Sequence, residues 1–319
     1  MKTVLLARRA MNTRFELLLH GERETALRAA GEEALDEIER LETQLSLFRA
    51  TSEVAHLNRH AADRPVPVSP PVFRLLERAR ELWAASGGAF DPTVEPLMRL
   101  WGFRDTNAAA PAPEAVAAAR AIVGMDKLKL DPATRRVRFL KAGLRLDLGA
   151  IGKGYAVDCA VEVLREAGVT SALIHGGTSS VYGLGRMPDG RPWKVALPEP
   201  RTPGPPAEIS SETPERVLAE FTLEDASLGV SAAWGRKLVL GGRELGHVLD
   251  PRTGEPVQRA ALAAVALPEA TESDALSTAL LVLGVGGVAT LRRFRPGLRA
   301  VVWSPASSTR APRGLPGAT

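Results

Sequence analysis

The spacing of apolar residues along the chain predicts helices and strands in irregular alternation. Helical spacing covers Glu24–Leu47, Leu75–Ala85 and Thr271–Leu283, and a further short helix is expected up to Arg293. Short β-like runs lie on either side of Met11-Asn12-Thr13 and at Leu128–Leu130, Arg136–Leu140, Arg145–Leu148, Ala172–His175, Val217–Val230, Lys237–Leu249 and Arg299–Trp303. This alternation without a fixed period favours an α+β or mixed α/β fold with a mixed or antiparallel sheet and flanking helices.

One stretch combines a predicted strand, a glycine loop and a helix. The run Leu144–Leu148 carries the carboxylate of Asp147, three glycines and Lys153 follow, and residues 154–167 have helical spacing. Glycine lets the backbone approach a ligand, and a helix N-terminus offers free N–H groups to an anion. The loop lacks the P-loop and Rossmann fingerprints, so it predicts either a phosphate site of another kind or an ordinary turn.

Length and composition are those of a globular protein of one or two domains. The chain has 319 residues, and we expect residues 1–303 to form one domain that divides, if at all, near residue 125. Residues 304–319, rich in Ser, Pro and Arg, are predicted to be disordered. Ala108–Pro113 is predicted to be a loop.

The charge pattern argues against nucleic-acid binding. The net charge is +4, and basic residues are interleaved with acids rather than gathered in a stripe. No run of 18 apolar residues exists, so no membrane span is expected. Cys159 is the single cysteine, which excludes an intrachain disulfide and suits a reducing compartment. With no signal peptide visible, we expect a cytoplasmic protein, or a periplasmic one if a leader had been removed.

Three further clusters carry candidate chemistry. Asp274 and Thr278 are four residues apart on a predicted helix, and their oxygens suit Mg²⁺, although an Asp near a helix start is often only a cap. His247–Pro256 contains a tight-turn sequence, and Ser86–Thr93 offers a glycine pair beside Phe90 that would admit a ring or simply end a helix. The remaining histidines, His20, His56, His60 and His175, show no metal-ligand spacing.

Taken in order, these clusters resemble the FAD:protein FMN transferase family, the ApbE-type flavin transferases. The resemblance covers residues 10 to about 284. It rests mainly on Met11–Thr13, Leu45–Arg49, Gly88–Thr93, Asp147–Asp158, Gly176-Gly177, His247–Pro256 and Ser273–Ala279. The family usually has other residues where this chain has Asn12, Thr178 and Ala232.

The resemblance implies a T-fold-like ApbE-type architecture and a Mg²⁺-dependent transferase. FAD would be cleaved at its diphosphate, AMP released and FMN moved to a Ser or Thr of an acceptor protein. By position, the Ala150 carbonyl and the side chains of Asp274 and Thr278 would hold Mg²⁺. The FAD site would be lined by Met11, Phe48, Ala89, Phe90, Asp91, Asp147, Lys153 and His247. His247, which can titrate near neutrality, is the candidate base, and Asp274 the second catalytic residue.

Two other functions share these residues. An enzyme with the same metal site would be an FAD pyrophosphatase if water replaced the protein hydroxyl. A flavin-binding protein without catalysis is the third reading, motivated by Asn12, Thr178 and Ala232, and retention of Asp274 and Thr278 argues against it.

Overall fold

A seven-stranded antiparallel sheet forms the centre of the fold in the computed structural model, which describes residues 1–103, 109–200, 216–233, 237–240, 243–258 and 260–304. The spatial order is β1-β2-β6-β7-β10-β15-β16, and every neighbouring pair is antiparallel. The strands are β1 (Lys2–Ala10), β2 (Thr13–Gly21), β6 (Ser171–Gly176), β7 (Ser180–Gly185), β10 (Ala226–Ala232), β15 (Leu262–Leu267) and β16 (Arg299–Trp303). Alternate residues of β1 and β2 are buried, as the sequence pattern predicts.

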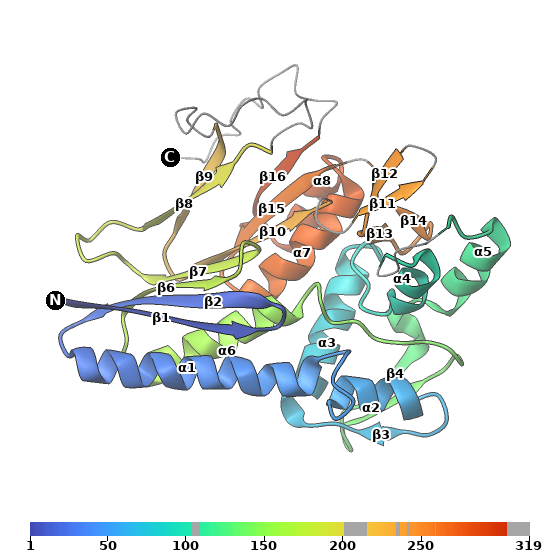
Figure 1. Ribbon diagram of the computed structural model, residues 1–319, viewed down its shortest axis with the longest axis horizontal. Helices are drawn as coiled ribbons and strands as arrows, with labels where there is room; N and C mark the ends of the chain where they lie inside the picture. Colours follow the sequence, from blue (N-terminus) through green and yellow to red (C-terminus); the bar gives the residue numbers. More distant parts are fainter. Residues whose placement is uncertain (104–108, 201–215, 234–236, 241–242, 259, 305–319) are drawn as a thin grey trace.

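Three helices bury one face of this sheet: α1 (Glu24–Leu45), α6 (Gly152–Glu166) and α7 (Ala270–Leu283). Side chains from the helices and from the inner face of the sheet form the main hydrophobic core. Figure 1 shows α1 running along the β1–β2 hairpin, with α6 and α7 deeper in the molecule. Helix α7 is buried on nearly all sides, and its polar residues Glu272, Asp274 and Ser277 are buried along with its apolar ones.

The opposite face of the sheet is covered by a two-stranded hairpin. Strands β8 (Trp193–Pro198) and β9 (Val217–Leu223) pair with each other and bury Trp193, Phe221 and Leu223 against β7, β10 and β15. This second, smaller core lies away from the helices (Figure 1). The helices and the candidate site residues are therefore on the side of the sheet that carries the main core.

The remaining elements gather at one end of the sheet, on the right in Figure 1. The helices there are α2 (Glu53–His60), α3 (Pro70–Ala85), α4 (Glu95–Trp101) and α5 (Pro113–Ile122). The small strands are β3 (Val66–Pro67), β4 (Leu128–Asp131), β5 (Arg136–Phe139), β11 (Lys237–Leu240), β12 (Arg243–Gly246), β13 (Leu249–Asp250) and β14 (Glu255–Pro256). A 3₁₀ turn (Met125–Lys127) and α8 (Gly287–Phe294) complete the elements. Leu97, Trp101, Val116 and Leu249 form a third core between α4, α5 and β13.

The predicted α+β class with an antiparallel sheet and flanking helices is confirmed, but several local predictions are wrong. Residues 144–148 are not a strand: they form only one isolated bridge, between Arg145 and Val94. Helices α4 and α5 were not predicted, and α3 starts at Pro70, five residues before the predicted start at Leu75. Residues 305–319 and 104–108, which include most of the predicted tail and one end of a predicted loop, lie outside the described residues.

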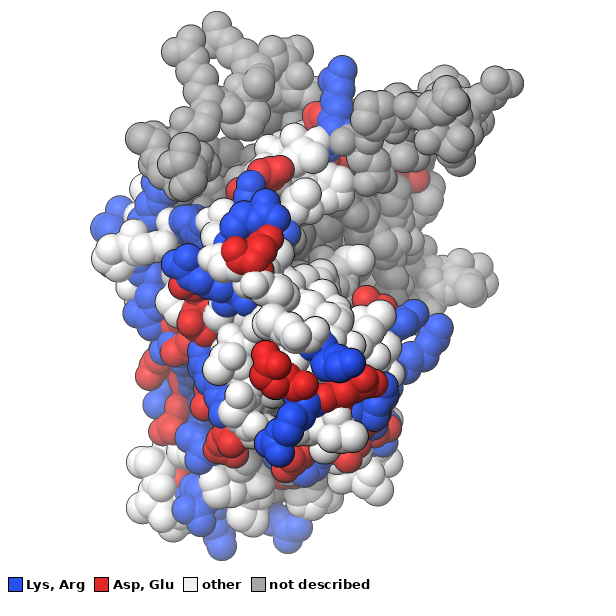
Figure 2. Space-filling view, turned by 90° about the vertical axis from the view of Figure 1, so that its left-hand side faces the viewer, with Lys and Arg blue, Asp and Glu red and all other residues white. Residues whose placement is uncertain are grey.

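Charged side chains of both signs are interspersed on the face shown in Figure 2. Ion pairs also join the elements: Arg8 on β1 pairs with Glu32, Asp36 and Glu39 on α1. No helix in the described part of the chain is long and apolar enough to cross a membrane.

Candidate functional site

Helices α6 and α7 meet at the glycine loop, and this contact places Lys153 beside Asp274. The backbone N–H of Gly154, in the first turn of α6, donates to Oδ2 of Asp274 at 2.9 Å. The Nζ of Lys153 lies 3.9 Å from Oδ1 of Asp274 and donates to the carbonyl of Gly149 at 3.2 Å. The sequence suggested that Asp274 might only cap its own helix, but its carboxylate instead caps the neighbouring helix α6.

Glycine at position 154 is required by this close approach. A Cβ there would lie 2.2 Å from the carbonyl oxygen of Ala270 and 2.7 Å from Cβ of Asp274. The glycine-rich sequence therefore has a structural purpose, since it lets the helix that carries Asp274 pack against the loop. The Asp274 carboxylate is buried, with only 4% of its side chain exposed.

Thr278 lies one turn further along α7 and is oriented by β10. Its Oγ1 is 2.9 Å from Oγ of Ser231, which is also 2.8 Å from Oγ of Ser277. Small residues on one face of β10 allow this, because a Cβ on Gly229 would lie 2.1 Å from the carbonyl oxygen of Ser273. Ser231 thus belongs to the contact between β10 and α7.

Residues 144–148, before the glycine loop, are extended. Their backbone hydrogen bonds go to the Asn58 side chain and to the loop at Pro92 instead of to a sheet. The amide of Asn58 on α2 bonds both backbone groups of Leu146, at 2.9 Å and 2.7 Å. The N–H of Asp147 donates to the carbonyl of Pro92 at 2.7 Å, and Oδ1 of Asp147 accepts from Gly149 N–H at 2.9 Å. These contacts bring the predicted clusters at 88–93 and 147–154 together.

Asp91 is buried in this junction. Its Oδ1 accepts from the N–H and the hydroxyl of Thr93, at 2.8 Å and 2.6 Å. Burial raises the pKa of the Asp91 carboxyl to about 6, against the opposing effect of the hydrogen bonds from Thr93 and Trp83. Ala89 and Phe90 are each only 1% exposed and pack in the main core. With the side chains in the core, the backbone is the part of this pair that remains to contact a flavin.

Met11 lies in the β1–β2 turn, and Phe48 lies in the segment that follows α1. Met11 and Asn12 form the two-residue β1–β2 turn and both have positive φ, at 50° and 59°. Such a turn favours Asn or Gly, which explains Asn12 as a compatible substitute for glycine. Phe48 follows α1 and is 59% exposed. The last residue of α1, Leu45, lies 3.9 Å from the Cβ position of Gly152, which places this end of α1 beside the start of α6.

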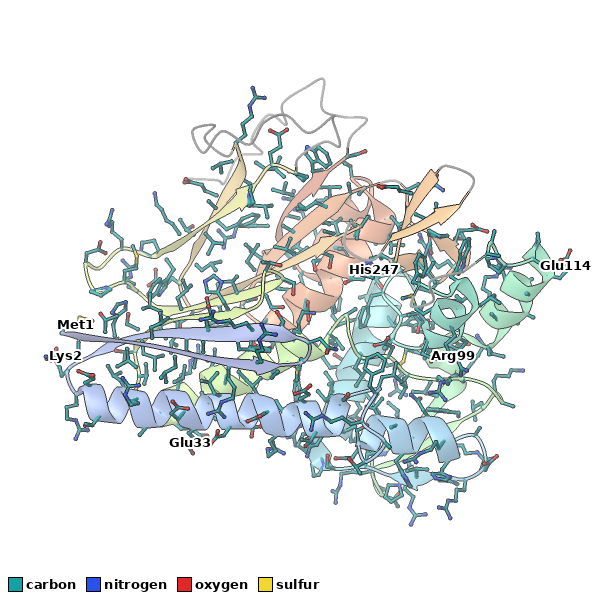
Figure 3. The ribbon with its side chains drawn as sticks, viewed as in Figure 1. Met1, Lys2, Glu33, Arg99, Glu114 and His247 are labelled. Atoms are coloured by element: carbon teal, nitrogen blue, oxygen red, sulfur yellow. The ribbon has the colours of Figure 1, made fainter. Side chains whose placement is uncertain are left out.

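His247 lies on the segment between β12 and β13 (Figure 3), at the boundary of two cores. The next residue, Val248, packs against the main core, whereas Leu249 is buried in the third core. The following turn is fixed by Arg252, whose guanidinium pairs with the carboxylate of Asp250 at 2.7 Å. Cγ of Arg252 is 3.7 Å from the Cβ position of Gly88, so the His247–Pro256 cluster adjoins the 86–93 cluster.

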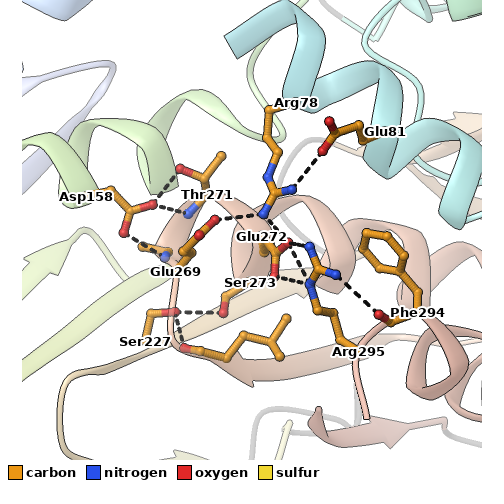
Figure 4. Close-up of polar contacts among 12 residues, drawn as sticks. Arg78, Glu81, Asp158, Ser227, Glu269, Thr271, Glu272, Ser273, Phe294 and Arg295 are labelled. Atoms are coloured by element: carbon orange, nitrogen blue, oxygen red, sulfur yellow. Dashed lines mark hydrogen bonds and ion pairs between the residues drawn. The ribbon is translucent and has the colours of Figure 1, made fainter. Parts of the chain in front are cut away.

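Sequence reasoning missed a buried ionic network that fixes the start of α7 (Figure 4). The carboxylate of Glu272, 3% exposed, pairs with the guanidinium groups of Arg295, just after α8, and of Arg78 on α3. Asp158 on α6 accepts hydrogen bonds from the first residues of α7. The place of Glu272 in the first turn of a predicted helix singles it out in the sequence. Its partners Arg78 and Arg295 are too distant in sequence for a local pattern to connect them with it.

These residues also fit the metal that the sequence resemblance implies. In the described part of the chain, no three His, Cys, Asp or Glu side chains gather as a metal site. A cation here would therefore need one carboxylate supplemented by hydroxyl and backbone oxygens, the hard donors that Mg²⁺ prefers. Asp274 and Thr278 supply two of them, and Ala150 lies two residues before α6. Lys153 shows that the Asp274 carboxylate already faces a positive charge.

The chain is similar over most of its length to known proteins of one family. The model of a family described as the ApbE family matches residues 11–302. An FAD:protein FMN transferase of Treponema pallidum is 32% identical over 90% of this chain and 80% of its own length, and one of Klebsiella pneumoniae is 30% identical over 81% and 71%. The crystal structure of an ApbE protein from Thermotoga maritima has a TM-score of 0.83 at 25% identity, covering 97% of this chain and 99% of that one. Apo flavinyl transferase ApbE of Pseudomonas stutzeri gives 0.80 at 28% identity, covering 98% of each chain.

Proposed function

Because this chain belongs to the ApbE family, we propose that it is a transferase that moves FMN from FAD to a Ser or Thr hydroxyl of an acceptor protein and releases AMP. The observation that carries the proposal is the crossing of α6 and α7, where a glycine loop, Lys153 and Asp274 converge. The names of the similar proteins support the reaction, and the same proposal takes residues 1–303 as one domain.

In the proposed reaction, the acceptor hydroxyl oxygen attacks the phosphorus on the FMN side of the diphosphate. The bond from that phosphorus to the bridging oxygen breaks, AMP leaves with the bridging oxygen, and the hydroxyl proton passes to a base. The Ala150 carbonyl, the Asp274 carboxylate and the Thr278 hydroxyl would hold Mg²⁺, which when bound neutralises the charge of the diphosphate.

The chain's own residues supply binding and orientation. The Lys153 ammonium at the start of α6 would face the diphosphate, since an ammonium stabilises an anion. Ser231 fixes the Thr278 hydroxyl, and Asp147 holds the loop through Gly149. Met11, Phe48, Asp91 and the backbone at Ala89 and Phe90 surround the flavin in this proposal. His247 takes the proton from the acceptor hydroxyl.

The proposal is tested by incubating the protein with FAD and Mg²⁺, with and without a Ser/Thr acceptor peptide. Release of AMP together with a peptide mass increased by one FMN less water is expected. AMP release with an unchanged peptide would instead support the FAD pyrophosphatase, and flavin binding without AMP would support the non-catalytic flavin-binding protein.

Two variants separate the metal from the base. Asp274→Asn keeps the shape of the side chain that bonds Gly154 but loses the charge, so Mg²⁺-dependent AMP release should be abolished while FAD still binds. Asp131→Asn, at an exposed turn, is the matched control and should retain activity. His247→Ala should lower FMN transfer more than FAD affinity, and equal losses of both would reassign His247 to binding alone.

A further inference from the structure

The α6–α7 crossing has a second polar contact one turn away from the first. Asp158 follows Gly154 by four residues on α6, and Ala270 precedes Asp274 by four residues on α7, so each pair shares one helix face. Oδ1 of Asp158 accepts from the N–H of Ala270 at 2.8 Å, and Oδ2 accepts from the N–H of Thr271 at 2.8 Å. Oδ2 also accepts from the Thr271 hydroxyl at 2.5 Å.

The two helices therefore cap each other. Asp274 of α7 accepts from an N–H in the first turn of α6. Asp158 of α6 accepts from two N–H groups in the first turn of α7 (Figure 4). Neither helix has a side-chain cap of its own, because the N-cap residues Ile151 and Glu269 make no such hydrogen bond. The first N–H groups of a helix need an acceptor, and here the other helix supplies it.

We propose that Asp158 is a positioning residue for the reaction: by capping α7 it fixes the place of Asp274 and Thr278 relative to the glycine loop. The inference rests on the function proposed above, in which these two side chains hold the metal. Asp158 itself touches neither FAD nor metal. It acts through the first turn of α7, which leads directly to Asp274.

The contact suits an ionised acid specifically. Both carboxylate oxygens accept, whereas an amide in the same place would turn an NH₂ group toward one of the two N–H donors. Burial raises the pKa of the Asp158 carboxyl to about 6, and the bonds from Thr271 and Ala270 oppose that rise. The carboxylate is still the main form at pH 7.

The deciding experiment measures AMP release from FAD against Mg²⁺ concentration for wild type and Asp158→Asn. Residues that orient metal ligands typically change metal affinity or activity by 10 to 100-fold, so the half-saturating Mg²⁺ concentration should rise about tenfold. The KM for FAD should change less than about twofold, because the flavin-facing residues are untouched. A variant that is merely less folded would lose kcat and keep the same Mg²⁺ dependence. Asp189→Asn, the same change at an exposed turn, is the control and should match wild type.

Thr271→Val is the milder second variant, used if Asp158→Asn does not fold. It removes one hydrogen bond to Asp158 and keeps the two backbone bonds, so a smaller rise in half-saturating Mg²⁺ of about two- to threefold is expected. If Asp158→Asn folds and its half-saturating Mg²⁺ concentration is unchanged, the inference is overturned and the proposed function stands. If only Thr271→Val folds, an unchanged half-saturating Mg²⁺ concentration in that variant has the same meaning. A wild type that releases no AMP would overturn the proposed function, and this inference with it.

Discussion

Gly154→Ala is the sharpest test of how tightly α6 and α7 must approach. The added methyl group would lie 2.2 Å from the carbonyl oxygen of Ala270, whereas ordinary contact begins near 3.4 Å. The obstacle is backbone on one side and Cβ of Asp274 on the other, so no rotamer change can relieve it. The two helices must separate by about 1 Å, which also lengthens the hydrogen bond from Gly154 to Asp274.

The expected cost is the balance of three effects. Overpacking of this kind costs about 1–3 kcal/mol, and weakening a hydrogen bond to a charged acceptor costs up to about 1.5–3 kcal/mol. Alanine in place of glycine within a helix contributes about 1 kcal/mol in the other direction. We therefore expect the free energy of unfolding to fall by about 2–4 kcal/mol, which is large against a typical total of about 5–15 kcal/mol.

Gly152→Ala is the matched control, because it lies two residues earlier in the same helix. Its Cβ would meet only Cδ1 of Leu45, at an ordinary 3.9 Å, so its stability should stay within about 1 kcal/mol of wild type. Both variants are compared by urea unfolding followed by far-UV circular dichroism. A Gly154→Ala protein as stable as Gly152→Ala would refute the close approach of α6 and α7.

Three further variants test other parts of the structure by urea unfolding. Glu272→Gln removes the buried carboxylate that pairs with Arg78 and Arg295 and should lower the free energy of unfolding by about 1–3 kcal/mol, because both guanidinium groups are partly exposed and Arg78 keeps its pairs with Glu81 and Glu269; an unchanged value would contradict the pairing. Trp101→Phe removes the indole N–H that donates to the Gly254 carbonyl at 2.8 Å and should cost about 1–3 kcal/mol, a result that an unchanged midpoint would disprove. Asp91 has a pKa raised from 3.8 to about 6 in the folded protein, so between these values the folded state binds more protons and the Asp91 contribution to stability falls as pH rises. The free energy of unfolding of wild type minus that of Asp91→Asn should therefore decrease from pH 4 to pH 6. A difference that stays constant or increases would contradict that pKa.

The sequence predicted an element well where its apolar residues repeat with one period and all face one core. Helix α1 has a clear apolar face and was predicted to within two residues of its C-terminal end. Helices α4 and α5 were missed because they are short and α5 buries only Val116, so their pattern is weak. Residues 144–148 have the alternation of a strand, but their backbone partners are Asn58 and Pro92. Local pattern predicts an extended chain and does not reveal what holds it.

In the candidate site, too, some residues could be predicted from local sequence patterns and others could not. Asp274 and Thr278 were found by their spacing on one helix, and Lys153 by its place in a glycine loop. The contributions of Asp158, Ser231 and Asn58 come from contacts across 47 to 113 residues of sequence, which no local pattern contains. The side chains of Ala89 and Phe90 are buried in the core, which the glycine pair beside them did not reveal, and their place in the FAD site stays a prediction.

The most direct measurement of the central claim is a crystal structure of the protein with FAD and Mn²⁺ in place of Mg²⁺, in which the anomalous signal locates the metal. The account predicts one metal peak bonded to the Asp274 carboxylate and the Thr278 hydroxyl, with a diphosphate oxygen of FAD beside Lys153. A flavin bound elsewhere, or a metal that contacts neither side chain, would contradict the account.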